Sequence, residues 1–307
     1  MREYNSILLT GATGFVGSHL ASHFLRRGQL VHCLVRPNSN LQQLDWLKGA
    51  VQLHTYDGTT ASVIRILQEV HPRCVFHLAS MSIATHSFDQ IESLILSNVL
   101  LGTQLLEAMT IRGVESFINT GTFWQHYNTE NYHPSCLYAA TKQAFEDILQ
   151  YYADAKAINA ITLNLFDTYG PHDSRNKLFS QLRRAASTGI PLEMSPGGQK
   201  LDLVFIDDVV DAFVQAELNL SATTLPSCQA FGVSSGHHVV LRDLVAQYSR
   251  VIGKDIPIKW GARPYREREI MTPWLPTQHL PGWSARTDLD EGMKLMEDSI
   301  DNTESSR

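Results

Sequence analysis

A tyrosine and a lysine four residues apart are the first candidates for acid–base chemistry in this sequence. They stand in Tyr138-Ala139-Ala140-Thr141-Lys142, and residues at that spacing share one face of a helix. A free phenol has a pKa of about 10. An ammonium beside it would favour the phenolate and make the tyrosine useful as an acid or base near neutrality. An exposed Tyr and Lys without a chemical role is the alternative.

A threonine after a predicted strand could join this chemistry. The strand covers 116–120, and parallel topology would bring Thr120-Gly121-Thr122 to the carboxyl edge of a sheet, where ligands bind. A hydroxyl there can steady a substrate carbonyl. Ordinary β-propensity of threonine is the alternative, although Gly121 suits a strand exit better than a strand interior.

Three glycines spaced by two residues each predict where a phosphate would bind. Gly11, Gly14 and Gly17 follow the apolar run 7–9 and open the amphipathic segment 16–27, which predicts a strand, a tight loop and a helix. Glycines let backbone amides approach a phosphate, and the helix supplies a positive N-terminal end. A dinucleotide pyrophosphate is the expected ligand, and a structural turn is the alternative. Beside a nicotinamide, the Tyr138–Lys142 pair becomes a candidate catalytic site.

The residues after the second and third predicted strands indicate which dinucleotide binds. An acidic residue at the tip of the second strand commonly grips the adenosine ribose, whereas an arginine there accommodates a 2′-phosphate. Here the strand ends Leu34-Val35-Arg36, so NADP(H) is favoured and NAD(H) stays possible. Asp57, in Asp57-Gly58, is a candidate acceptor for the adenine amino group. The alternatives are a solvated charge for Arg36 and a turn cap for Asp57.

The elements that must position these residues alternate between strands and helices. Apolar β-rich runs stand at 30–35, 51–56, 74–79, 116–120 and 160–166. Segments with helical period, such as the one from Ile91 to Met109, lie between them. This alternation implies a parallel sheet covered on both faces. The predicted fold class is α/β, a Rossmann-type doubly wound parallel sheet.

The pattern loosens after Gly170-Pro171, which predicts a smaller carboxyl-terminal α/β region that binds substrate. A helix is expected near 177–188, and a late strand within 225–236 is expected to return to the sheet. The predicted cofactor domain covers 1–169 plus about 225–250. The predicted substrate region covers about 170–224 plus 251–300, and 301–307 is expected to be a frayed tail.

Composition argues against several classes of protein. The 307 residues include 25 basic and 31 acidic side chains, a net charge of -6, with no basic tract, so nucleic acid is not an expected partner. The adjacent His237 and His238 would point to opposite faces of a strand, and no metal is expected. Neither a disulfide framework nor a zinc site is indicated by the spacing of Cys33, Cys74, Cys136 and Cys228.

No membrane or secretory segment is expected either. The chain has no run of about 18 apolar residues, and the apolar run 7–9 is too short for a signal-peptide core. We therefore expect a cytoplasmic protein without a membrane partner.

Several motifs, taken together in their order and spacing, resemble the extended short-chain dehydrogenase/reductase family (the NAD-dependent epimerase/dehydratase family) over nearly the full chain, and its nucleotide-sugar members in particular. The matching features are Thr10 to Gly17, Phe76-His77-Leu78-Ala79-Ser80, Asn98, Thr120 to Thr122, Tyr138 to Lys142, Phe166-Asp167-Thr168-Tyr169-Gly170-Pro171 and Asp207-Asp208-Val209.

The resemblance implies that Thr122, Tyr138 and Lys142 form a catalytic trio, and that the protein is a homodimer built from the helices around Asn98 and Tyr138. The expected substrate contacts are Ser82, Thr122, Lys177 and Arg263. The family's Arg-Asp-Phe motif is Leu201-Asp202-Leu203 here, which leaves the grip on the diphosphate open. With the residues derived above, the expected cofactor contacts are Gly11, Thr13, Gly14, Phe15, Val16, Gly17, Arg36, Asp57, Gly58, Leu78, Ala79, Ser80, Asn98, Thr120, Tyr138, Lys142 and Phe166.

Three branches of the resemblance predict different reactions. Sugar-nucleotide 4,6-dehydratases carry an Asp-Glu pair after the catalytic hydroxyl residue, but this chain has Phe123-Trp124 there, so dehydration lacks its acid and base. The stretch around His172 resembles GDP-fucose synthase, whose epimerising cysteine is replaced by Trp124. His172 is then a substrate contact or a plain loop residue. The stretches 118–122 and 137–143 look most like the 4-ketoreductases of the CDP-abequose and CDP-paratose synthase group.

The expected activity is therefore NADPH-dependent reduction of the 4-keto group of a nucleotide-linked 4-keto-6-deoxyhexose. Thr122 would position the carbonyl, Tyr138 would donate the proton, and Lys142 would lower the pKa of Tyr138 and hold the ribose. A sugar-nucleotide 4-epimerase with bound NAD is one alternative. A non-catalytic NADP-sensing regulator is the other, although such sensors usually lose the Tyr or the Lys.

Overall fold

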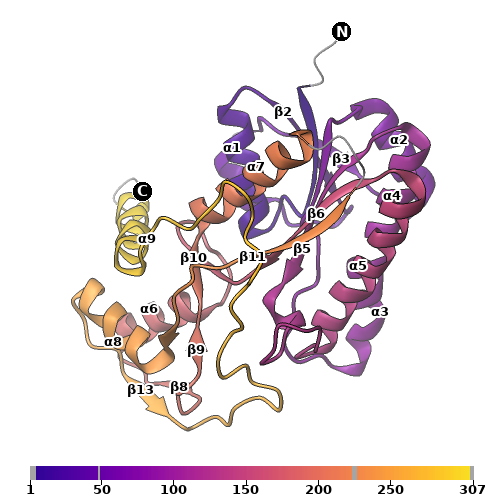
Figure 1. The fold of residues 1–307 in the computed structure, drawn as a ribbon. Coiled ribbons are helices and arrows are strands. Elements are labelled where there is room, and N and C mark those ends of the chain that lie inside the picture. Colours follow the sequence, from indigo (N-terminus) through magenta and orange to yellow (C-terminus); the bar gives the residue numbers. More distant parts are fainter. Residues whose placement is uncertain (1–4, 48, 223–226, 305–307) are drawn as a thin grey trace.

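A seven-stranded parallel sheet in the order β11-β6-β5-β4-β1-β2-β3 forms the centre of the molecule (Figure 1). The computed structural model describes residues 5–47, 49–222 and 227–304, with 301–304 as backbone only. The order reverses between β1 and β4, as in a doubly wound fold, and the predicted fold class is confirmed. The strands are β1 (Ser6–Thr10), β2 (Leu30–Val35), β3 (Gln52–Thr55), β4 (Cys74–His77), β5 (Ser116–Thr122), β6 (Asn159–Leu165) and β11 (Cys228–Val233).

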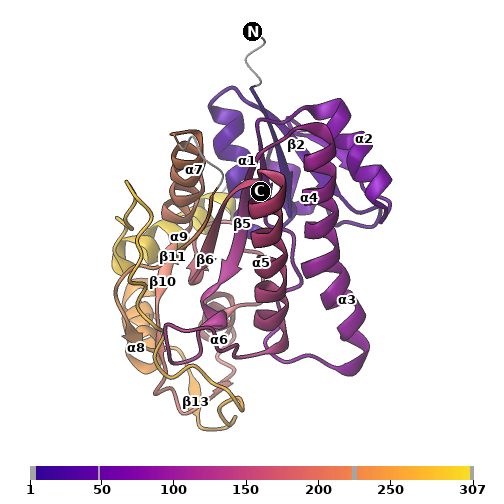
Figure 2. The same ribbon diagram turned by 45° about the vertical axis from the view of Figure 1, so that its right-hand side comes forward.

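Helices cover both faces of the sheet (Figures 1 and 2). Successive residues of a strand point to opposite faces, so that Ile7 and Leu9 of β1 pack in one core and Leu8 in the other. Burial on both faces explains why the strands are continuous apolar runs. The first core is covered by α1 (Phe15–Arg26) and α7 (Ile206–Ala222), and the second by α2 (Thr60–Val70), α4 (Leu101–Arg112) and α5 (Leu137–Lys156).

A smaller lobe lies beyond the carboxyl end of the sheet (Figure 1). It is joined to the sheet by β7 (Asp167–Tyr169), which pairs in parallel with β10 (Leu203–Phe205). Strand β11 returns to the sheet and pairs with β6. The two-domain division stays a prediction, and its boundary at 224–225 falls outside the described residues. The lobe comprises α6 (Leu178–Thr188), β8 (Leu192–Met194), β9 (Lys200–Leu201), β12 (Val239–Val240), α8 (Leu241–Ile252), β13 (Ile258–Trp260) and α9 (Leu289–Glu304).

The tail that was expected to fray, 301–307, lies partly in α9, which continues to Glu304, and 305–307 fall outside the described residues. Fraying there stays a prediction. The expectation of no stretch apolar enough to span a membrane needs correction, because Phe88–Arg112 is a continuous helical segment of 25 residues that is long and apolar enough to cross one by length and composition. Half of its most apolar stretch is buried, and core helices pass the same test. It comprises η2 (Phe88–Gln90), α3 (Ile91–Ile95), the π-helical turn η3 (Leu96–Leu100) and α4.

Candidate active site

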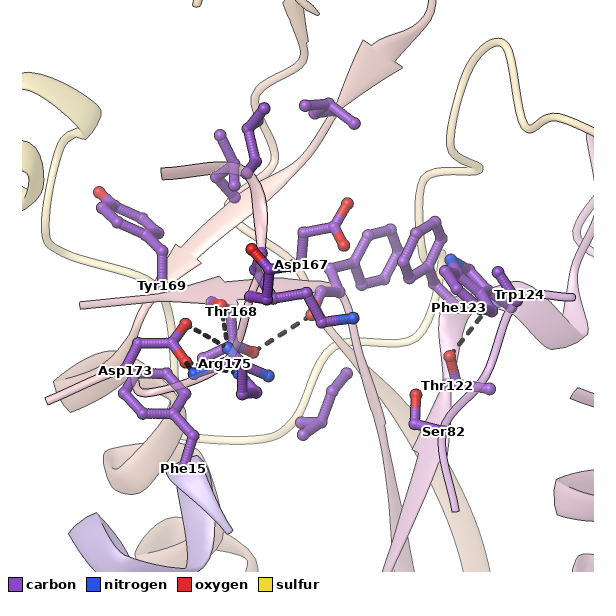
Figure 3. Close-up of a pocket in the computed structure, with 18 of the residues that line it drawn as sticks. Phe15, Ser82, Thr122, Phe123, Trp124, Asp167, Thr168, Tyr169, Asp173 and Arg175 are labelled. Atoms are coloured by element: carbon purple, nitrogen blue, oxygen red, sulfur yellow. Dashed lines mark hydrogen bonds and ion pairs between the residues drawn. The ribbon is translucent and has the colours of Figure 1, made fainter. Parts of the chain in front are cut away.

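A cavity of about 1360 Å³ extends from the carboxyl edge of the sheet into the smaller lobe. Its walls come from the β1–α1 loop, the segment after β4, the end of β5, the start of α5, helix α6 and residues 263–270. Figure 3 shows part of this wall. Ligands of doubly wound sheets bind at this edge, so the cavity is the candidate active site.

The glycine loop lies on the sheet side of the cavity and fits the pyrophosphate of a dinucleotide. Gly11 has φ +74°, and a Cβ there would lie 2.6 Å from the backbone nitrogen of Ala79. A Cβ on Gly17 would collide with the carbonyl oxygen of Gly11. These two glycines therefore permit close packing of loop, helix and β4. Gly14 is the N-cap of α1 without a side-chain cap and lines the cavity, which leaves the first helical amides for an anion.

Thr122, at the end of β5, lies beside Tyr138 of α5. Thr122 and Tyr138 line the cavity and are each 6% exposed, while Lys142, one helical turn beyond Tyr138, is 1% exposed. Burial raises the pKa of Tyr138, and hydrogen bonding with Ser82, Ser80 and Thr122 lowers it. Burial also lowers the pKa of Lys142 to about 8, against the attraction of Glu146.

The expectation that Lys142 lowers the pKa of Tyr138 stays a prediction. In this protein without ligand, desolvation is the largest effect on the phenol, because burial disfavours the phenolate. Tyr138 is therefore a protonated phenol at neutral pH. This state suits a proton donor.

Asn98 does not line the cavity, but it makes hydrogen bonds to two segments that carry cavity residues. It lies in the π-helical turn η3 and is fully buried. Its Oδ1 accepts from the Met81 backbone nitrogen at 2.7 Å, and its Nδ2 donates to Thr141 Oγ1 at 2.9 Å. The amide thus ties the segment after β4 to α5 between Tyr138 and Lys142. The predicted direct contact between Asn98 and the cofactor stays untested.

Aromatic rings occupy the two positions directly after Thr122. Phe123 stacks on Phe166, with ring centroids 4.9 Å apart and planes 12° from parallel. Trp124 meets the Tyr138 ring edge-on at 6.0 Å, and its backbone nitrogen donates to Thr122 Oγ1 at 3.3 Å (Figure 3). The place where a dehydratase would carry two carboxylates is an apolar wall.

Charged side chains that the sequence analysis did not single out surround the middle of the cavity. Arg175 donates to Asp173 Oδ1 at 2.7 Å and to the Thr168 carbonyl at 2.9 Å, and its guanidinium lies 4.5 Å from the centre of the Phe15 ring (Figure 3). Arg175 stands two residues before Lys177, a predicted substrate contact, and this proximity could have indicated it from the sequence. Burial raises the pKa of Asp167 to about 6, and Lys177, Arg266 and Arg175 pull it down.

The predicted substrate residues lie among these charges. Lys177 and Arg263 line the cavity, and so do Arg266 and Arg268. The Nε and Nη2 atoms of Arg268 are buried without a hydrogen-bond partner in the described protein, and its guanidinium lies 4.3 Å from the centre of the Tyr127 ring. Guanidinium groups bind diphosphates well. These arginines can therefore bind a diphosphate in place of the family's arginine, which is Leu201 in this chain.

Most of the predicted site residues line one cavity, and the others lie outside its lining. Arg36 and Asp57 are exposed. Asp57 Oδ1 accepts from the backbone nitrogen and hydroxyl of Thr59, the N-cap of α2, so the turn-cap alternative is realised. Their cofactor roles stay predictions. The residues outside the lining are Thr13, Arg36, Asp57, Gly58, Ala79, Asn98 and Lys142.

Within the described ranges, no group of three or more His, Cys, Asp or Glu side chains is arranged to hold a metal ion. His237 and His238 lie between β11 and β12.

Several known proteins are similar to this chain over most of its length. A CDP-abequose synthase from Salmonella muenchen is 27% identical over 296 residues, covering 94% of this chain and 96% of the relative. A UDP-glucose 4-epimerase from Mycolicibacterium smegmatis is 26% identical over 309 residues, covering 93% and 95%. The crystal structure of a UDP-glucose 4-epimerase with UDP-glucose from Thermotoga maritima has a TM-score of 0.83 at 23% identity, covering 97% and 99%.

A second structural neighbour is the Thermus thermophilus UDP-glucose 4-epimerase in complex with NAD, with a TM-score of 0.82 at 23% identity, covering 96% of this chain and 99% of that chain. At these identities the solved structures establish the fold. The model of the NAD dependent epimerase/dehydratase family matches residues 7–224. This chain belongs to the NAD dependent epimerase/dehydratase family and is an enzyme of the NAD(P)-dependent oxidoreductase type.

Proposed function

We propose that the enzyme reduces the 4-keto group of a nucleotide-linked 4-keto-6-deoxyhexose with NADPH. The observation that carries the proposal is the wall formed by Thr122, Tyr138 and Trp124, in which a hydroxyl and a protonated phenol lie beside an apolar ring. Such a wall can orient a carbonyl and donate one proton. The similarity to CDP-abequose synthases supports the same function.

In this mechanism each residue has one task, and the bound dinucleotide supplies the hydride. The hydroxyl of Thr122 holds the substrate carbonyl, and Tyr138 gives its phenolic proton to the oxygen as charge develops there. The Lys142 ammonium stabilises the phenolate that remains. Arg263, Arg266 and Lys177 hold the diphosphate and so fix the sugar in the cavity.

The preference for NADPH rests on Arg36. This side chain is exposed at the end of β2, where an arginine can bind a 2′-phosphate. The similar structure of a UDP-glucose 4-epimerase in complex with NAD supports the alternative, a 4-epimerase with bound NAD. An epimerase recycles its bound NAD and consumes no NADPH, which makes the two activities separable by experiment.

The partner of the protein is proposed to be a second copy of the same chain. Phe88, Ile91, Ile95, Leu96 and Leu100 are 89%, 43%, 45%, 55% and 38% exposed. Their spacing places them along one face of the helical segment 88–112. A continuous apolar face of this kind is covered in an assembly, and the resemblance to dimeric enzymes names the second copy.

The test is an assay of the purified protein with CDP-, dTDP- and GDP-linked 4-keto-6-deoxyhexoses, each with NADPH and with NADH. Loss of NADPH absorbance with one of these sugars, absent in Tyr138→Phe, is the expected result. The variant should still bind NADPH, because the phenol contributes the proton and little of the binding. Interconversion of UDP-glucose and UDP-galactose without NADPH consumption would establish the epimerase instead. If the protein binds NADPH but neither reduces a 4-keto sugar nor interconverts the UDP-sugars, the result would favour the non-catalytic NADP-sensing regulator.

A further inference from the structure

The face of α5 that carries Tyr138 and Lys142 continues to a carboxylate that the proposed mechanism does not use. Glu146 follows Lys142 by four residues, so the three side chains occupy successive turns of one helix face. Tyr138 lines the cavity, and Glu146 does not. Glu146 can therefore act on the chemistry through its neighbours, without touching substrate.

The first neighbour is Gln125, which is 0% exposed. Its Nε2 donates to Glu146 Oε1 at 3.0 Å and to Gln143 Oε1 at 3.1 Å. Its Oε1 accepts from the Thr122 backbone nitrogen at 2.9 Å. Burial raises the pKa of Glu146 to about 7, while the hydrogen bond from Gln125 and the charge of Lys142 lower it. Above that pKa the carboxylate only accepts hydrogen bonds, so Glu146 fixes which end of the Gln125 amide faces α5. The other end is then held against Thr122.

Gly121 makes room for this arrangement in β5. A Cβ on Gly121 would lie 2.9 Å from Glu146 Oε1 and would collide with Asn164 Oδ1. Any larger residue would force the side chains of Asn164 and Glu146 to move. The glycine between the two threonines therefore serves the approach of Glu146 to the end of β5.

The second neighbour is Lys142, whose burial disfavours the ammonium. Glu146 on α5 favours the charged lysine, and His77 on β4 has its pKa lowered to about 3 by burial first and by Lys142 second. Glu146 itself faces Lys142, Asp147 and Cys228 of β11. Among the described charged groups around Lys142, Glu146 is thus the one that favours its ammonium.

We propose that Glu146 is a positioning residue for Thr122 and Lys142. It orients Gln125, which holds the backbone of Thr122, and its carboxylate keeps Lys142 charged. The statement about catalysis rests on the proposed function. The statement about the charge of Lys142 does not, because it concerns the enzyme alone.

The experiment compares Glu146→Gln, Glu146→Asp and Asp154→Asn in the full chain, titrated without added ligand. Glu146→Gln keeps an oxygen for Gln125 and removes the charge, whereas Glu146→Asp keeps the charge and shortens the reach. Asp154 is the matched control, because it is an exposed carboxylate of the same helix that accepts from Gln150 four residues earlier at 2.8 Å.

The first readout is the titration of Lys142 by NMR of ¹³C-labelled lysine, with its signal assigned by Lys142→Arg. We expect the pKa of Lys142 to fall by about one unit in Glu146→Gln and to stay near the wild-type value in Glu146→Asp and Asp154→Asn. An unchanged Lys142 pKa in folded Glu146→Gln would overturn the electrostatic half of the proposal.

The second readout is kinetic. Both Glu146 variants should lower kcat roughly tenfold with little change in KM, because the lost interactions act on the reacting groups rather than on substrate binding. Wild-type kcat in both variants would overturn the positioning half. If the wild-type enzyme reduces none of the 4-keto sugars, the proposed function fails, and the lysine titration still decides the charge of Lys142.

Discussion

Trp46 and His172 stack face to face, with ring centroids 5.2 Å apart and planes 14° from parallel. Trp46 belongs to η1 (Gln42–Leu47) after β2, and His172 follows β7. Gln43 Nε2 also donates to the His172 carbonyl at 2.8 Å. His172 has φ 60°, a left-handed conformation that these contacts hold. The loop that carries Arg175 is thereby fixed over the first turn of α1.

Trp46→Ala should weaken cofactor binding. Without the stack, the loop after β7 must be ordered when the ligand binds, which we expect to raise the Kd for NADPH roughly fivefold, since an aromatic pair contributes about 1 kcal/mol. Isothermal titration calorimetry measures the change. Trp46→Phe keeps a ring opposite His172 and is the control. Equal affinities in the two variants would contradict the role of the stack.

Gly14→Ala should weaken cofactor binding, whereas Gly17→Ala should lower the stability of the fold. A Cβ on Gly14 meets only the Gly11 carbonyl oxygen at 3.2 Å, so we expect a folded protein with at least roughly tenfold weaker NADPH binding at the helix N-terminus. A Cβ on Gly17 collides with the Gly11 backbone, and we expect a loss of about 2 kcal/mol or more in unfolding free energy. Urea unfolding and cofactor titration separate the two effects.

Arg36→Ala tests the choice of dinucleotide. We expect the Kd for NADPH to rise roughly tenfold, because the variant loses a charge-assisted contact to the 2′-phosphate. NADH lacks that phosphate, so its Kd should not change. Titration of both cofactors against wild type and variant provides the comparison. A parallel loss for both would show that Arg36 does not read the phosphate.

His77 should make the protein less stable in acid. Its pKa is lowered from 6.5 to about 3, mainly by burial, so the stability from the neutral imidazole is complete above pH 6.5 and is lost as the pH falls toward 3. In His77→Asn this loss is absent. The advantage of wild type over variant in unfolding free energy should shrink by about 1.4 kcal/mol per pH unit below 6.5. Parallel stability curves from pH 7 to about 5 would contradict the assignment.

Phe88→Glu combined with Leu96→Glu should yield a monomer. Both side chains are exposed on the helical segment 88–112, so charges there cost nothing in the separate chain but oppose burial in a dimer. Sedimentation velocity should give a dimer for wild type. Ile190→Glu changes another apolar residue, 68% exposed in the lobe, and should remain dimeric. A wild-type monomer would refute the proposed partner.

Much of the architecture was predictable because it depends on local pattern. The apolar runs and the glycine loop predicted β1 and α1 to within one residue at each end, and the spacing of Tyr138 and Lys142 predicted a helix there, which is part of α5. Glu146 continues the same helical spacing, so its signal was present in the sequence. Its role became visible only through Gln125, which no spacing rule connects with α5.

Which residues line the cavity was less predictable from the sequence. Arg36 and Asp57 satisfied a motif for the adenosine end, yet they are exposed outside the lining. Arg175 and Arg266 are far apart in the sequence, and both act on the carboxylate of the half-buried Asp167. Contacts between residues so far apart in the sequence depend on how the lobe packs against the sheet. Local periodicity does not encode that packing.

The sequence by itself determined the parallel sheet, the glycine turn before α1 and the shared helix face of Tyr138 and Lys142, because backbone sterics and helical or strand period act over a few residues. The tertiary structure decided the state of those side chains. Burial raises the pKa of Tyr138 and lowers that of Lys142 to about 8, since desolvation depends on every segment packed around a group. It also decided which distant cations share the cavity, because that contact exists only after the chain has folded.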